Sequence, residues 1–249
     1  MSSPGDPLLA LIGFTVGVLV GLTGVGGGSL TTPALILLGY PPPIAVGTDL
    51  LYATLTRIAG VLLVGRRGRV HRRIALRLLA GSLPSVVLGG LILKYIPVEA
   101  LSKPLTILLA IVLVGTGALS LARETLDLPV TPTRKHAYLL GFTVALIVQF
   151  TSVGAGVLVG FALVNIVRLD PLEAVGTVLA YGLVLSTLSL ANYLALGLLD
   201  PGAALLLSLG GIPGVALGVH AASRAKPERL KKIINIIIII VGIIILIKN

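Results

Sequence analysis

Apolar stretches of about twenty residues follow one another along this chain with almost no interruption. A single apolar run of about 18 residues already predicts a membrane-spanning helix, and several in series predict a polytopic membrane protein. Only 11% of the residues are charged, compared with about 25% in soluble domains, so the chain cannot cover a water-exposed surface. We therefore expect one all-α polytopic membrane domain that spans residues 1–249.

The basic residues of the chain indicate a membrane protein and not a nucleic-acid partner. The net charge is +10, but most Lys and Arg residues lie in short breaks between apolar runs, which is typical of cytoplasmic loops. The chain has no Cys, which excludes thiolate metal sites. It also has no HExxH or Walker motif and no His/Asp cluster, so we expect no metal, no cofactor and no enzymatic activity.

The two halves of the chain share landmarks in the same order. GLTGVGGG at 21–28 resembles QFTSVGAG at 149–156 with an offset of 128 residues, and AVGT at 45–48 recurs at 174–177 with an offset of 129. The same offset relates Tyr52 to Tyr181, and it relates Gly81 and Pro84 to Gly210 and Pro213. This order predicts two homologous repeats, 7–122 and 134–247.

The distribution of basic residues predicts that the two repeats are inverted in the membrane. An inverted arrangement places fifteen basic residues on one side: six in 66–77, five in 223–232, and Arg123, Arg134, Lys135 and Arg168. Only Lys94, Lys103 and Lys248 fall on the other side. The positive-inside rule then predicts a multi-pass protein of the cell membrane with both termini outside.

The first two apolar segments of each repeat are short. Segments 8–22 and 28–39 span roughly 22 Å and 18 Å as helices, less than a hydrocarbon core of roughly 30 Å. We interpret each pair as a hairpin that turns at a glycine-rich break, although two short tilted crossings also fit. Each repeat then has a broken hairpin followed by three transmembrane helices. The two turns should meet near the bilayer centre, where irregular backbone must be covered by protein or water.

Two helices that restart after these breaks would direct free backbone N–H groups and positive dipole ends toward one another. Such an arrangement predicts an anion site, and glycine lets a ligand approach the backbone closely. The alternative is that the small residues serve close helix packing. The candidate residues at the breaks are Thr23, Gly26, Gly27, Gly28, Thr151, Ser152, Gly154 and Gly156, with Ser29 and Thr31 as further hydroxyl donors.

Four residues of the following helices are further candidates. Thr48 and Thr177 could line the same cavity, or their hydroxyls could bond to their own helix backbone. Asp49 is the acid well inside an apolar segment, where a carboxylate predicts a function such as proton coupling, unless water reaches it at the helix end. Arg57 could bind an oxyanion or extend toward the interface. Tyr52, Tyr181, Gln149, Asn165 and Asn192 are expected mainly to bridge helices.

The motifs resemble those of the TauE/SafE family of sulfite and organosulfonate exporters. The first-half elements of the resemblance are GVGGG at 24–28, Pro33, AVGT at 45–48 and GSLP at 81–84, and the second-half elements are VGAG at 153–156, AVGT at 174–177 and GGIP at 210–213. Ala155 replaces a glycine, and Ser85 follows Pro84 where the family often has glycine. The resemblance implies a secondary transporter of small anions, typically sulfur oxyanions or sulfonates.

The leading hypothesis is therefore an alternating-access carrier that exports sulfite or a related anion in a manner coupled to the proton gradient. The alternatives are an anion channel of the same architecture and a cation carrier that uses Asp49. The expected partners are a small inorganic or organosulfur anion and the lipid bilayer, and the sequence is compatible with a homo-oligomer.

Overall fold

A computed structural model of the chain describes residues 7–23, 27–64, 70–122, 134–222 and 227–248. Over these ranges the chain is helical and has no strand, as the all-α prediction requires. The elements in chain order are α1 (Pro7–Thr23), α2 (Gly28–Leu37), α3 (Pro42–Val64), α4 (Arg72–Tyr95), α5 (Val98–Ala122), α6 (Arg134–Thr151), the π-helical segments η2 (Ala155–Val159) and η3 (Ala162–Ile166), α7 (Pro171–Ala195), α8 (Pro201–Ala222) and α9 (Pro227–Lys248).

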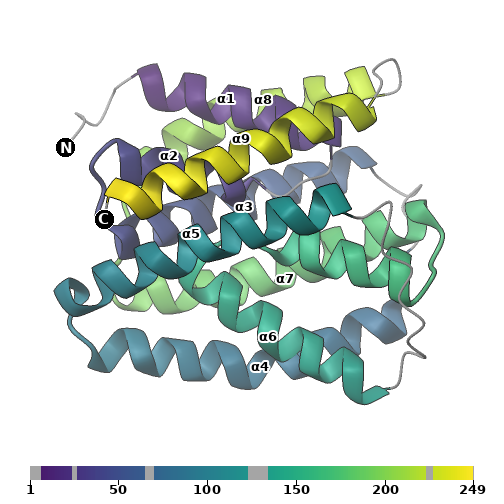
Figure 1. Cartoon of the computed structure of the whole chain (residues 1–249), viewed down its shortest axis with the longest axis horizontal. Helices are drawn as coiled ribbons and strands as arrows, with labels where there is room; N and C mark the ends of the chain where they lie inside the picture. Colours follow the sequence, from purple (N-terminus) through teal and green to yellow (C-terminus); the bar gives the residue numbers. More distant parts are fainter. Residues whose placement is uncertain (1–6, 24–26, 65–69, 123–133, 223–226, 249) are drawn as a thin grey trace.

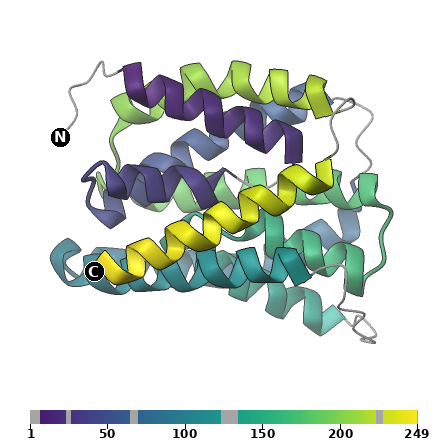
Figure 2. The ribbon, with the colours of Figure 1, turned by 45° about the horizontal axis from the view of Figure 1, so that its top comes forward.

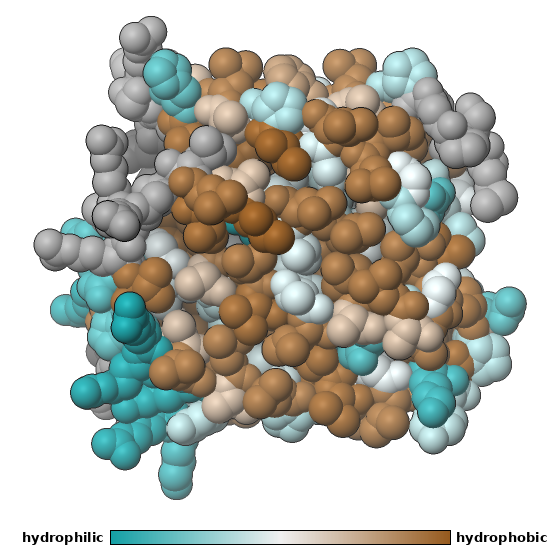
Figure 3. All heavy atoms as spheres, turned by 180° about the vertical axis from the view of Figure 1, so that it is seen from behind, coloured by the Kyte–Doolittle hydropathy of each residue, from teal (hydrophilic) through white to brown (hydrophobic). Residues whose placement is uncertain are grey.

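Five of the described helices, α3, α4, α5, α7 and α8, are long and apolar enough to cross a membrane, with spans of 21 to 24 residues. Helix α9 has 22 residues, and its apolar described part is the shorter stretch Lys232–Ile247. In Figure 3, apolar residues cover the middle of the visible face, and hydrophilic residues gather toward its two ends. The protein is therefore a multi-pass membrane protein. Its orientation and the membrane in which it resides stay predictions.

The first two helices run in opposite directions. Helix α2 returns toward the end of the bundle at which α1 begins (Figure 2). Helix α9 ends at this same end of the bundle (Figure 1). The break between α1 and α2 and the break after α6 lie where the glycine-rich segments predict them. How deeply each hairpin enters a bilayer stays a prediction.

The first helix of each predicted repeat packs along the fourth helix of the other. Helix α1 lies along α8, and α6 lies along α4. Both contacts depend on glycine, because a Cβ added at Gly210 of α8 would overlap the carbonyl oxygen of Ala10, and one added at Gly81 of α4 would overlap that of Tyr138. Small residues that let backbones approach in this way are typical of helix contacts in membranes. The two halves of the chain are therefore joined by two close helix pairs.

Two hydrogen bonds between helices and loops are related by the offset of the sequence repeat. The backbone N–H of Asp200 donates to Oγ1 of Thr48 (2.9 Å), and the backbone N–H of His71 donates to Oγ1 of Thr177 (2.9 Å). Both partners in one bond are 129 residues from the partners in the other. These paired contacts support the predicted inverted repeat, which stays a prediction.

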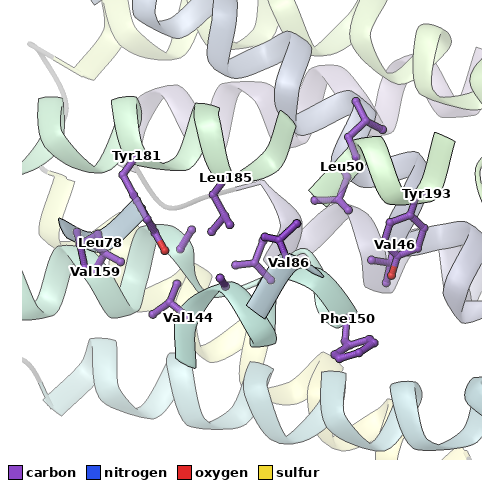
Figure 4. Packing of buried hydrophobic residues seen from close by; sticks show 14 of the residues in the cluster. Val46, Leu50, Leu78, Val86, Val144, Phe150, Val159, Tyr181, Leu185 and Tyr193 are labelled. Carbon is purple, nitrogen blue, oxygen red and sulfur yellow. The ribbon is translucent and has the colours of Figure 1, made fainter. Parts of the chain in front are cut away.

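The central core lies between α3, α4, α6 and α7. It includes Val46 and Leu50 of α3, Leu78 and Val86 of α4, Val144 of α6, and Tyr181, Leu185 and Tyr193 of α7 (Figure 4). The same cluster includes Phe150 before the break after α6 and Ala155 behind it. The arrangement thereby positions the polar residues at the breaks.

Candidate functional site

The two chain breaks meet inside the molecule. Gly28, the first residue of α2, lies against the backbone of Ser152, which follows the end of α6. A Cβ added at Gly28 would overlap the carbonyl oxygen of Ser152 and would lie 3.0 Å from Oδ2 of Asp49. Both Gly28 and Ser152 are buried. The break of the first half, the break of the second half and the carboxylate of α3 therefore form one buried site.

The first break directs a helix N-terminus into this site. The carbonyl oxygen of Gly27 accepts hydrogen bonds from the N–H groups of Leu30 and Thr31, both at 2.9 Å. The first turn of a helix carries N–H groups that have no acceptor within the helix, and it forms the positive end of the helix dipole. The start of α2 at Gly28 thus brings a partial positive charge to its contact with Ser152.

The second break has an unusual backbone. Ser152 and Gly154 have positive φ angles of 58° and 109°, a conformation that glycine adopts without a steric penalty and serine adopts at a cost. The N–H of Leu158 then donates to the carbonyl oxygen of Gly154 (2.8 Å), and the chain continues as π-helix. The helix of the second half therefore restarts at Ala155, one residue before Gly156. Its π-helical turns are wider than the α-helical turns of α2, which restarts in the first half.

Asp49 is the charged residue at the centre of the site. Its side chain is fully buried, and the hydroxyl of Thr32 donates a hydrogen bond to Oδ2 at 2.7 Å. The hydroxyl of Ser152 lies beside the same carboxylate without reaching hydrogen-bond geometry, and Thr31 lies nearby. Oδ1 has no hydrogen-bond partner among the described residues. Asp49 therefore places a carboxylate group where the start of α2 attracts negative charge.

Arg57 lies two helical turns farther along α3. Nη1 of Arg57 donates to the carbonyl oxygen of Gly182 on α7 at 3.0 Å, and the guanidinium interacts electrostatically with Asp49 and Tyr181. Eight residues of α-helix correspond to a rise of about 12 Å. Arg57 is therefore an electrostatic neighbour of the site, and its side chain joins α3 to α7.

Several of the secondary candidates bridge helices, as expected. The hydroxyl of Tyr52 donates to the carbonyl oxygen of Gly13 (3.1 Å), and the Tyr181 hydroxyl is hydrogen-bonded to that of Ser82 (3.0 Å). The amide of Asn192 donates to the carbonyl oxygen of Val86 (2.9 Å). Gln149 differs from these residues, because its side-chain atoms have no partner among the described residues.

Three predicted threonines have backbone partners. The Thr48 and Thr177 hydroxyls accept from the loops before α8 and α4, and Thr177 also donates to the carbonyl oxygen of Glu173 (2.7 Å). The hydroxyl of Thr151 donates to the carbonyl oxygen of Ile147 (2.7 Å). These bonds show a structural function for all three, and their contact with a ligand stays a prediction. Gly26 and the side chain of Thr23 lie outside the described residues.

Thr32 and Ser189 are among the polar residues of the interior that were not identified from the sequence. Thr32 is the hydrogen-bond donor to Asp49, and its position four residues after Gly28, on the same face of α2, is a signal that could have identified it. Ser189 of α7 is fully buried, and its hydroxyl has no partner in the described part of the chain. Nothing in the sequence distinguishes Ser189 from the other serines of the apolar runs.

The site presents backbone N–H groups, hydroxyls and a helix dipole, which are groups that proteins commonly use to bind small anions. Its own carboxylate competes for the same positive charge, so an added anion is favoured when Asp49 carries a proton. In the described residues no three His, Asp or Glu side chains lie together in a group that could hold a metal ion. The chemistry of the site therefore follows from these hydrogen-bond donors and from Asp49.

Comparison with known proteins gives matches along nearly the whole chain. The family model described as Sulfite exporter TauE/SafE matches residues 9–245. Probable membrane transporter protein YjnA of Bacillus subtilis (strain 168) is 35% identical over 251 residues, which cover 94% of this chain and 97% of that protein. A probable membrane transporter protein of Xylella fastidiosa (strain 9a5c) is 28% identical over 242 residues, which cover 93% and 91%.

Proposed function

The chain belongs to the sulfite exporter TauE/SafE family, and from this premise we propose that it is a secondary-active carrier of small anions. The proposed substrates are sulfite and related sulfur oxyanions or sulfonates, moved across the cell membrane. The observation that carries this proposal is the buried contact of Gly28 with Ser152 beside Asp49. Substrate sites between broken helices near the membrane centre are typical of secondary transporters built from inverted repeats.

The burial of the site supports a carrier more than a channel. Asp49 has no exposed surface, and Thr32 and Ser152 beside it are buried as well. An anion therefore reaches these groups only when the helices that cover them move apart. A carrier needs such a movement, alternately toward each side of the membrane, whereas a channel needs a continuous pore. We propose that the two hairpins, which enter the bundle from opposite ends, separate in turn.

Asp49 is the proposed coupling residue. A buried carboxylate beside the start of α2 repels a second negative charge in the same place, and a proton on Asp49 removes this repulsion. Anion and proton therefore bind together. Thr32 donates to Oδ2 and keeps the carboxyl group in place in both protonation states, because its hydroxyl can be a donor or an acceptor.

Ligand-induced thermal stabilisation of the purified protein tests this function. The panel contains sulfite, sulfate, thiosulfate, a short alkylsulfonate and chloride as sodium salts, with matched potassium salts as cation controls. A ligand that binds only the folded protein raises the free energy of unfolding by about 2.7 kcal/mol when its concentration is about a hundred times its Kd. We expect a higher unfolding temperature with one or more sulfur anions. Stabilisation that follows the cation and is independent of the anion would overturn the proposal.

A further inference from the structure

Gln149 has a buried side-chain amide whose hydrogen-bonding capacity is unused. It lies on α6, one turn before Ser152, and has no exposed surface. Neither Nε2 nor Oε1 has a hydrogen-bond partner among the described residues. Buried side-chain amides are nearly always hydrogen-bonded in folded proteins, because burial without a partner costs free energy. The fold therefore keeps a polar group here that a packed apolar side chain could replace.

The neighbouring helices hold this side chain in place. A Cβ added at Gly89 of α4 would overlap Cγ of Gln149, so the absence of a side chain at Gly89 provides the space that Gln149 fills. The hydroxyl of Tyr193 on α7 donates to the main-chain carbonyl oxygen of Gln149 at 2.7 Å. Contacts from both sides thus fix Gln149, while its amide group stays without a partner in the described chain.

A second unused polar group lies on the facing helix. Ser189 of α7 is fully buried, and Oγ has no partner among the residues that the structure describes. Ser189 is one helical turn before Tyr193, which contacts Gln149, and three residues after Ser186, which receives a hydrogen bond from Thr54 of α3 (3.1 Å). Residues at this spacing share one face of a helix. Ser189 therefore lies on the face of α7 that is turned toward α3 and α6.

We propose that Gln149 and Ser189 form a polar subsite next to the Asp49 site and select an oxyanion that still carries one proton. This inference rests on the proposed function. An amide has a donor and an acceptor, so Nε2 of Gln149 donates to an oxyanion oxygen and Oε1 accepts from the O–H of the same ion. Ser189 supplies a further donor. Chloride has no O–H, and the fully deprotonated ion has none either, so neither satisfies Oε1.

Gln149 is close in the chain to the Asp49 site. Ser152, which contacts Gly28 and lies beside Asp49, follows Gln149 by three residues. In the proposed subsite, an anion at the start of α2 extends toward the amide of Gln149. A site that uses a hydrogen bond to a substrate O–H rejects analogues that lack this group, because its own polar atom is then left unpaired.

The test compares Gln149→Leu and Ser189→Ala with wild type in binding hydrogensulfite, at mildly acidic pH, and chloride. For Gln149→Leu we expect about a 10- to 100-fold weaker Kd for hydrogensulfite, a chloride Kd within about threefold of wild type, and an unfolding temperature that is unchanged or higher. Ser189→Ala should also weaken the binding of hydrogensulfite. The matched control Ser186→Ala should bind both ions as wild type does, because Ser186 donates to the carbonyl oxygen of Leu183 and is paired with Thr54.

The subsite is overturned by a hydrogensulfite Kd for Gln149→Leu within about threefold of wild type, or by equal losses of hydrogensulfite and chloride binding. A lower unfolding temperature with an unchanged ratio of the two Kd values would likewise show a purely structural role. If wild type itself binds no anion, the proposed function fails before this inference is reached. Failure of the variants alone leaves the proposed function intact and removes only the subsite.

Discussion

Replacing Asp49 with asparagine is expected to abolish the pH dependence of binding and transport for an anion that does not itself titrate, such as chloride. An anion bound at the start of α2 would be a close neighbour of the carboxylate, and two like charges separated by roughly 5 Å repel by about 3 kcal/mol at an effective dielectric constant of about 20. This repulsion corresponds to roughly a hundredfold in Kd. Anion binding by the wild type should therefore tighten by about this factor as the pH falls and Asp49 takes up a proton.

The variant and its control separate coupling from structure. Asparagine has the size of aspartate and keeps a hydrogen-bond acceptor for Thr32, so Asp49→Asn should fold and bind chloride with one affinity at all pH values. Transport by this variant should no longer follow an imposed pH gradient. Glu99→Gln removes an exposed carboxylate at the start of α5 and should behave as wild type. A pH dependence that persists in Asp49→Asn would make Asp49 a purely structural residue.

The sign of this coupling can be measured directly. If Asp49 must be protonated before the anion binds, addition of chloride to weakly buffered wild-type protein takes up protons from solution, and addition to Asp49→Asn takes up none. Arg57 and Tyr52 on α3, Thr31 and Thr32 on α2 and Ser152 after α6 are the polar and charged groups that face Asp49. None of these groups removes the negative charge of Asp49 as a proton on its carboxyl group does. Proton release on anion binding would contradict the proposed mechanism.

Replacing Gly28 with alanine is the second change for which we expect a large effect. The added Cβ would overlap the carbonyl oxygen of Ser152 and would crowd the carboxylate of Asp49. A backbone carbonyl cannot rotate away as a flexible side chain can, so the two breaks must move apart. Overpacking of this kind lowers the free energy of unfolding by about 1–3 kcal/mol. Displacement of binding groups by about 1 Å is expected to lower transport by about a hundredfold.

Gly60→Ala is the matched control for this change. Gly60 lies on α3, and a Cβ added there meets no atom within 4 Å, so alanine should leave transport unchanged and raise stability slightly through its better helix propensity. Transport is measured in proteoliposomes and the unfolding temperature in detergent for both variants. If Gly28→Ala transports as well as Gly60→Ala does, the Gly28–Ser152 contact is not the transport site.

The sequence predicts most of the fold because apolar runs and glycine breaks act locally. The limits of α3, α4 and α5 follow from the lengths of their apolar runs, and the breaks before Gly28 and after Thr151 follow from the repeated glycine-rich segments. The same local patterns identify Asp49, because a carboxylate in an apolar run requires compensation. The packing of α1 against α8 was not predicted, because it depends on contacts between residues far apart in the chain.

The partners of polar side chains could not be predicted from the sequence. Thr48 and Thr177 follow a glycine near the start of a helix, a pattern that fits a cavity lining as well as it fits the loop contacts to Asp200 and His71. Thr32, the donor to Asp49, lies 17 residues away in the sequence. The sequence shows that a hydroxyl is present but not which of its many possible partners it bonds to, so only the tertiary arrangement assigns its role.

Counterflow of sulfite in proteoliposomes tests the central claim most directly. Vesicles that contain the wild-type protein are loaded with unlabelled sulfite, and the uptake of radiolabelled sulfite is compared with its uptake into vesicles loaded with chloride. An alternating-access carrier predicts faster uptake into the sulfite-loaded vesicles. Each unlabelled sulfite that is carried out of the vesicle brings the binding site to the outer side, where the site can bind labelled sulfite. Equal uptake into both kinds of vesicle, together with an anion current that does not saturate, would show a channel and contradict the account.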